Sequence, residues 1–185
     1  IHTNKSNFFI YNKLKNDNPN QINQVISDII KKSSLVFSEF KPDLLILTGD
    51  RYEMLSMALA SISGNLPIAH IHGGETSLGS FDDKSRNVIT KLSQIHFPAT
   101  KNAAKKIHQM GEPIRNITVA GAPALDGFLS KKRSKKESFL RLTSKFNIDL
   151  NDKIILITFH PVTIDFDNEM ENLDVIFNVL SKIKN

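Results

Sequence analysis

Acidic residues, histidines and glycines are concentrated in one short stretch of the chain. The stretch IAHIHGGETSLGSFDD, from Ile68 to Asp83, contains two histidines, three acidic side chains and three glycines. This composition is compatible with a metal site, with a turn that binds phosphate, and with acid–base chemistry on a sugar. These three possibilities can be distinguished only by the elements that surround the stretch.

The carboxylates are the most informative feature. Asp50 follows the apolar run DLLILT, and Glu75, Asp82 and Asp83 lie in or just after the loop that follows the next apolar run. Crowded carboxylates raise one another's pKa, so one can donate a proton while another stays an anion. Such a set can stabilise an oxocarbenium-like sugar and move protons between neighbouring atoms. Of Asp82 and Asp83 we expect one to be a helix N-cap and the other to be functional, and the alternative for Asp50 is a simple ion pair with Arg51.

The histidines allow a metal site without favouring it. His70 and His72 alternate in PIAHIH, so a strand there would place both on one face, with Asp50 and Glu75 as candidate further ligands. A His-x-His pair in an apolar strand is more often packed and hydrogen-bonded than metal-bound. We therefore expect no metal.

The glycines indicate close backbone approach rather than a dinucleotide site. The stretch GGETSLGS lacks the G-x-G-x-x-G spacing, so it does not favour NAD. Two glycines after a strand still indicate a left-handed turn or a close approach of the backbone. Helix N-termini expected after Asp50 and near Asp82 would suit a diphosphate.

Strand-like and helix-like segments alternate strictly along the first 121 residues. Apolar runs predict strands at 43–50, 67–72, 95–100 and 116–121, and helical periodicity predicts helices at 20–40, 54–62, from 82 onward and at 101–110. This order predicts an α/β, doubly wound Rossmann-like domain, with the strand at 43–50 buried on both faces. Ligands of such domains bind beyond the carboxyl ends of the strands, where the acidic residues fall.

The pattern changes after Gly121. We expect an N-terminal Rossmann-like domain over 1–130 whose first strand is missing, a linker and helix over 131–150, and the start of a second Rossmann-like domain over 151–185 that opens with a strand at 153–161. The basic run KKRSKKE carries no interleaved aromatic residues, so we interpret it as a linker and not as a nucleic-acid patch.

Composition sets further limits. The 185 residues are 40% hydrophobic, include no cysteine and carry a formal net charge of +5. Without cysteine there are no disulfides and no thiolate metal sites, and no apolar stretch is long enough to span a bilayer. We expect a cytoplasmic protein that binds anionic small molecules and neither nucleic acid nor membrane.

Five segments together resemble one enzyme family. GDRYEMLSMALA, PIAHIHGGE, FDDKSRNVITKLSQIHFPAT, VAGAPALDGFL and FHPVTID occur in the order found in hydrolysing UDP-N-acetylglucosamine 2-epimerases, which initiate sialic- and legionaminic-acid type biosynthesis. The resemblance implies a truncated GT-B-like arrangement of two Rossmann-like domains. It also implies a UDP-sugar substrate, a homo-oligomer and no cofactor.

The resemblance also implies roles for particular residues. Expected catalytic residues are Asp50, His72, Glu75, Asp82, Asp83 and His160, the last in the HPVT segment. Expected substrate-binding residues are Arg51, His70, Gly73, Gly74, Arg86 and Gly121. His72 stands where some relatives have a glutamate, so either Glu75 takes over part of that role or His72 acts with a tuned pKa.

The resulting expectation is a hydrolysing 2-epimerase. It would convert UDP-N-acetylglucosamine, or a close relative such as UDP-N,N'-diacetylbacillosamine, to UDP and the free 2-epimeric sugar through a glycal. The alternatives are a non-hydrolysing 2-epimerase, which retains the bond to UDP, and a nucleotide-sugar-binding domain without turnover.

Overall fold

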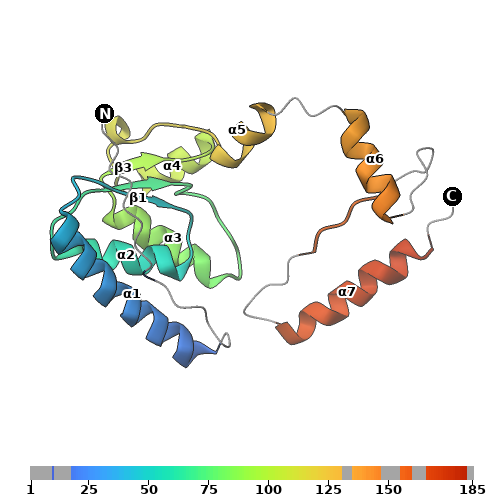
Figure 1. Ribbon diagram of the computed structural model, residues 1–185, viewed down its shortest axis with the longest axis horizontal. Coiled ribbons are helices and arrows are strands. Elements are labelled where there is room, and N and C mark those ends of the chain that lie inside the picture. The colour runs from blue at the N-terminus through green and yellow to red at the C-terminus, as the bar shows by residue number, and fades with distance from the viewer. Residues whose placement is uncertain (1–9, 11–17, 131–134, 147–154, 160–165, 183–185) are drawn as a thin grey trace. The chain divides into compact units, whose positions relative to one another are not determined.

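The computed structural model describes residue 10 and residues 18–130, 135–146, 155–159 and 166–182 (Figure 1). The chain divides into two compact units, the first ending at Gly121 and the second beginning at Ala122.

The first unit opens with a long helix whose two ends are set by local sequence. Helix α1 spans Pro19–Phe40, with Asn18 as its N-cap: the Asn18 side chain accepts a hydrogen bond of 2.9 Å from the Gln21 backbone N–H. The helix ends at Lys41, whose left-handed backbone (φ 47°) lets its N–H bond to the Phe37 carbonyl. Its apolar periodicity buries Ile29.

A three-stranded parallel sheet lies at the centre of this unit. Strands β1 (Leu45–Thr48), β2 (Ile68–Ile71) and β3 (Ile95–Phe97) are hydrogen-bonded in the order β1-β2-β3. Helix α2 (Tyr52–Ile62) connects the first two strands, and α3 (Phe81–Leu92) connects the second and third. Helix α2 packs against both α1 and α3, and Figure 1 shows these three helices on one side of the sheet. The predicted α/β class with a parallel sheet is confirmed.

The hydrophobic core lies between the sheet and these helices. It is centred on Leu47, Ala58, Ile68 and Ile89, each no more than 1% exposed. Fully burying a leucine or isoleucine side chain contributes about 1.5–3 kcal/mol, so this small cluster fixes the register of β1 and β2 under the helices.

The expectation that β1 is buried on both faces is wrong. Leu45 and Leu47 face the core, but Ile46 between them is 61% exposed. Since side chains alternate along a strand, the open side chain of Ile46 shows that the second face of β1 is uncovered within the described residues.

The strand predicted over 116–121 is only partly formed. Residues Ile114–Asn116 make a 3₁₀ turn (η1), and Ile117 forms a single parallel bridge with His96 of β3. The N–H of Thr118 donates to the His96 carbonyl (2.9 Å), and that of Ala120 donates to the Pro98 carbonyl (3.0 Å). The segment therefore follows the edge of β3 without regular strand geometry. Before it, α4 (Lys101–Gln109) forms as predicted.

The second unit contains helices α5 (Pro123–Ser130), α6 (Lys135–Phe146) and α7 (Phe166–Leu180). Residues 155–159, the described part of the strand predicted at 153–161, are not in a strand. A strand needs a neighbour for its backbone hydrogen bonds, and the described part of this unit offers none. The remaining residues of that prediction lie outside the described residues.

Among the helices that the structure describes, none has both the length and the apolar character needed to cross a bilayer.

Candidate functional site

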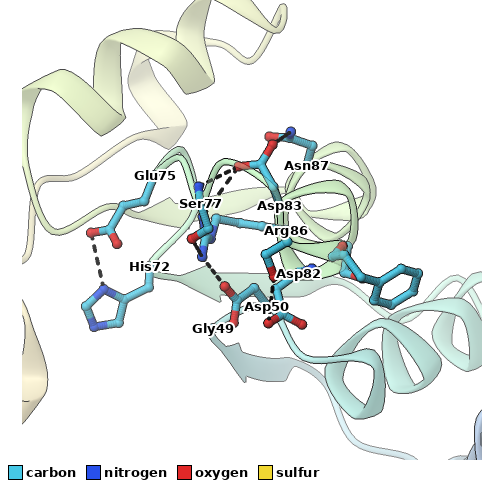
Figure 2. A network of polar contacts seen from close by, with 12 residues as sticks. Gly49, Asp50, His72, Glu75, Ser77, Asp82, Asp83, Arg86 and Asn87 are labelled. Atoms are coloured by element: carbon cyan, nitrogen blue, oxygen red, sulfur yellow. Dashed lines mark hydrogen bonds and ion pairs between the residues drawn. The ribbon is translucent and has the colours of Figure 1, made fainter. Parts of the chain in front are cut away.

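Asp50 and Arg86 meet at the carboxyl end of the sheet. Asp50 follows β1 after Gly49, whose positive φ of 87° turns the chain. Arg86, one turn into α3, is 6% exposed and forms an ion pair with the Asp50 carboxylate through Nη2 (Figure 2). Asp50 lies between β1 and α2 and Arg86 lies in α3, so the topology of the parallel sheet brings together residues from two successive connections.

Two further residues complete this network. The same Nη2 of Arg86 donates to Ser77 Oγ at 3.1 Å, and Nη1 lies 3.8 Å from Asp83 Oδ1. That Asp83 oxygen accepts the backbone N–H of Ser77 at 2.8 Å. We call Asp50, Ser77, Asp83 and Arg86 the Arg86 network. It places two carboxylates around one buried guanidinium, as Figure 2 shows.

The buried guanidinium keeps unused donors. Within the described residues, Nε and Nη1 of Arg86 make no hydrogen bond, although both atoms are buried. Buried N–H groups of a charged side chain are costly to leave without an acceptor. The Asp83 carboxylate, 3.8 Å from Nη1, offsets part of this cost electrostatically.

The N-cap of α3 is Ser80, and neither Asp82 nor Asp83 has that role. Ser80 Oγ accepts the backbone N–H of Asp82 at 3.1 Å, and its hydroxyl donates to the Asp82 carboxylate at 3.2 Å. The expectation of an aspartate cap is therefore wrong, because the helix begins at Phe81, one residue earlier than expected. Both aspartates lie in the first turn, where the positive end of the helix dipole favours their charge.

His72 and Glu75 form a separate, more exposed pair. His72 Nδ1 lies 3.6 Å from Glu75 Oε1, and their side chains are 25% and 40% exposed. Figure 2 shows the two side chains facing each other, apart from the labelled residues of the Arg86 network. Within the described residues, no hydrogen bond or ion pair links Glu75 or Asp82 to Arg86.

The predicted alternation of His70 and His72 does not occur. Strand β2 ends at Ile71, and His72 has a left-handed backbone with a φ of +67°. The side chain of His72 therefore does not follow the alternation of side chains along the strand. In the part of the chain that the structure describes, no three His, Asp or Glu side chains are grouped closely enough to hold a metal ion.

His70 lies inside the unit instead of facing a ligand. Its exposed fraction is 0%, and its ring nitrogens lie 2.8 Å from the Gly49 carbonyl and 3.1 Å from Thr90 Oγ1. Burial lowers the pKa of His70 to about 4, an effect that the hydrogen bond to Gly49 partly opposes. This position favours a supporting role over the substrate contact expected from the sequence.

The glycines of the β2–α3 loop are required by close packing. A Cβ on Gly73 would lie 2.9 Å from both His70 Nδ1 and Thr90 Oγ1. Gly74 has a φ of +79°, and a Cβ there would lie 2.3 Å from the Ala103 carbonyl oxygen of α4. Here the backbone approaches protein atoms, so the glycines position the loop.

The remaining predicted site residues, Arg51, Gly121 and His160, are not members of the Arg86 network. Arg51 is exposed and holds Glu53 through two hydrogen bonds of 3.1 Å, which raise the pKa of its guanidinium. Gly121 has a φ of +80° and open space around its Cα. His160 lies outside the described residues.

A hollow lies beside Asp50. It has a volume of about 480 Å³ and is lined mainly by the end of β1 and the first turns of α2: Ile10, Ile29, Thr48, Gly49, Asp50, Arg51, Glu53, Met54 and Met57. Asp50 therefore contacts Arg86 and also lines this hollow.

Sequence reasoning missed Ser77 and Thr90. Ser77 binds both Arg86 and Asp83, and Thr90 binds the His70 ring. Nothing in the sequence marks either residue.

Comparison with known proteins shows the family of this chain. Residues 5–185 match the family model described as UDP-N-acetylglucosamine 2-epimerase. The chain belongs to this family.

Individual relatives give the same assignment. The chain is 40% identical over 133 residues (72% of this chain, 34% of the relative) to a protein of Legionella pneumophila named UDP-N,N'-diacetylbacillosamine 2-epimerase (hydrolyzing). It is 31% identical over 177 residues (93% of this chain, 44% of the relative) to the GDP/UDP-N,N'-diacetylbacillosamine 2-epimerase (hydrolyzing) of Campylobacter jejuni. The chain thus spans less than half the length of either protein.

A solved structure supports the fold. The UDP-GlcNAc 2-epimerase of Neisseria meningitidis, bound to UDP-GlcNAc, aligns with a TM-score of 0.78 at 24% identity. The alignment covers 89% of this chain and 46% of that one. The expected GT-B-like fold class is confirmed at this level of similarity.

Proposed function

We propose that the full-length protein is a hydrolysing 2-epimerase that converts a UDP-linked 2-acetamido sugar to UDP and the free 2-epimeric sugar. The observation that carries the proposal is the Arg86 network, which holds two carboxylates at the carboxyl end of a parallel sheet in a chain of the UDP-N-acetylglucosamine 2-epimerase family. The names of the two relatives above support the hydrolysing type.

The proposed chemistry needs acids and bases around the sugar. The C1–O bond to UDP breaks first and builds positive charge on the ring, which nearby carboxylates stabilise. A base then removes the C2 proton to give a glycal. A water molecule then adds across the glycal double bond, with its hydroxyl group on C1. A proton is added to C2 on the face opposite to the one from which the first proton left, so the released sugar has inverted configuration at C2.

Particular residues are proposed for these steps. Asp50 and Asp83 would stabilise the charge and exchange protons, since Arg86 keeps both carboxylates oriented. Glu75 and His72, the exposed pair, would supply a second acid–base group from another side. Asp82 and His160 remain candidates from the sequence.

Two UDP-sugars test the proposal directly. The full-length protein is incubated in deuterium oxide with UDP-N,N'-diacetylbacillosamine or with UDP-N-acetylglucosamine, and NMR follows UDP and free reducing sugar. The expected result is release of UDP together with a free 2-epimer carrying deuterium at C2. Whichever UDP-sugar gives the higher kcat/KM defines the substrate.

Other products would favour the alternatives. A 2-epimer still linked to UDP would indicate a non-hydrolysing epimerase, and binding without turnover would indicate a nucleotide-sugar-binding protein. The variant Asp50→Asn should lower kcat by on the order of 10³-fold. The matched control Asp28→Asn, on an exposed position of α1, should leave kcat within about twofold because surface substitutions of this kind are near neutral.

A further inference from the structure

One buried imidazole links three elements around the turn that carries Asp50. His70 lies on β2 in register with Leu47 of β1 and His96 of β3, and its exposed fraction is 0%. Its Nε2 lies 2.8 Å from the Gly49 carbonyl at the end of β1, and its Nδ1 lies 3.1 Å from Thr90 Oγ1 of α3.

These contacts define the tautomer. The Gly49 carbonyl can only accept a hydrogen bond, so Nε2 of His70 must carry the proton. The neutral ring then has a lone pair on Nδ1, and the Thr90 hydroxyl donates to it. The hydrogen bonds therefore run in one direction, from Thr90 through His70 to Gly49.

The glycine turn is fitted around the same hydrogen bond. A Cβ on Gly73 would lie 2.9 Å from both atoms of the Thr90–His70 bond, which is closer than real Cβ atoms approach. Any side chain at this position would push the two partners apart. The hydrogen-bond chain and the loop that leads to Glu75 thus depend on each other.

We propose that His70 is a positioning residue for the activity proposed above, on which this inference rests. The chain of hydrogen bonds from Thr90 fixes the Gly49–Asp50 turn, so that the Asp50 carboxylate meets Arg86 in a single orientation. Two hydrogen bonds to β2 hold the turn at Gly49: its N–H donates to the Ile71 carbonyl at 3.0 Å, and its carbonyl accepts from His70. The second bond is the one that reaches Thr90 and α3.

The electrostatic surroundings keep the ring neutral. Burial lowers the pKa of His70 to about 4, and the neighbouring His96 and Arg86 act in the same direction. The bond to Gly49 and the charge of Asp50 oppose this shift without cancelling it. At neutral pH the ring is therefore in the form that the hydrogen-bond chain requires.

A spectroscopic test decides the hydrogen-bond chain without reference to activity. Full-length protein labelled with ¹⁵N in histidine is studied by long-range ¹H–¹⁵N correlation at pH 7, and the signal of His70 is assigned as the one lost in His70→Gln. The expected result is the neutral Nε2–H tautomer. A protonated ring, or the Nδ1–H tautomer, would overturn the proposal, and this wild-type spectrum needs no variant of Thr90 to fold.

Thr90 variants test the positioning role. Thr90→Val removes the donor, and Thr90→Ser keeps it. We expect about tenfold faster amide exchange at Gly49 and Asp50 in Thr90→Val, with near wild-type exchange in Thr90→Ser and in Ser93→Ala. Ser93 is the matched control, because its hydroxyl is also buried near the end of α3 but donates to the Ile89 carbonyl at 2.7 Å and not to His70.

Kinetics connect the positioning role to activity. Thr90→Val should lower kcat about tenfold with KM changed less than about twofold, and Thr90→Ser should restore kcat. Unchanged kcat and unchanged amide exchange in Thr90→Val would overturn the positioning role even if the tautomer is as expected. If wild-type protein turns over neither UDP-sugar, the proposed function fails, and the spectrum and the exchange rates still decide the part that His70 plays.

Discussion

The Arg86 network and the His72–Glu75 pair differ in burial, although both consist largely of residues predicted to act in the site. Arg86 is 6% exposed, whereas the Glu75 side chain is 40% exposed. Exposed ion pairs contribute little to stability, but a buried charge that loses its partner is strongly destabilising. The network is therefore part of the folded framework, and the pair is free to exchange partners with a ligand.

Removing the central charge of the network should have the largest effect. Arg86→Met leaves two carboxylates without a counter-charge, and we expect the free energy of unfolding to fall by about 4 kcal/mol. Urea titration measures this loss. Arg51→Gln, at an exposed arginine that also pairs with a carboxylate, should cost less than about 0.5 kcal/mol. Equal losses in the two variants would contradict the assigned difference in burial.

Gly74 tests how firmly the loop of the exposed pair is held. Gly74→Ala combines a positive φ with a Cβ placed 2.3 Å from a backbone oxygen of α4, so we expect a loss of about 3 kcal/mol. Gly121→Ala has a similar φ of +80° but open space, and should cost about 1 kcal/mol. Thermal unfolding compares the two. Similar losses would show that α4 does not anchor this loop.

Protonation of His70, whose ring binds the carbonyl of Gly49 next to Asp50, should make the free energy of unfolding depend on pH. His70 has a folded-state pKa of about 4, below the unfolded value of 6.5, so the unfolded chain binds the proton more readily. Its stabilising contribution is complete above pH 6.5 and is lost as the pH falls towards 4, by about 3 kcal/mol in total. Urea titrations between pH 7 and pH 4 should show a smaller slope for His70→Gln than for wild type. An identical slope would exclude His70 as the cause.

Glu75 should have the smallest effect on stability. Glu75→Gln breaks only an exposed pair, so we expect a change below about 0.5 kcal/mol. If Glu75 exchanges protons with the sugar, we expect the same variant to lower kcat by on the order of 10²-fold in the UDP-release assay. A stable variant with full activity would remove Glu75 from the proposed mechanism and leave the acid–base chemistry to the network.

Much of the fold follows from local patterns in the sequence. The order of strands and helices up to α4 was predictable because apolar periodicity is a property of a few adjacent residues. The placement of Asp50 and Glu75 just after parallel strands followed from the same patterns. The strand over 116–121 was not predicted correctly, since edge pairing depends on a partner and not on propensity.

The residue types at the carboxyl ends of the strands follow from the amino-acid sequence, which is also sufficient to assign the family. Which of these residues act together depends on the folded chain. Asp50 and Arg86 are 36 positions apart and become partners through the parallel sheet, while His70 and His72, two positions apart, are separated because the strand ends between them. The physical reason is that burial and hydrogen-bond partners depend on contacts across the fold, and periodicity along the chain does not specify these contacts.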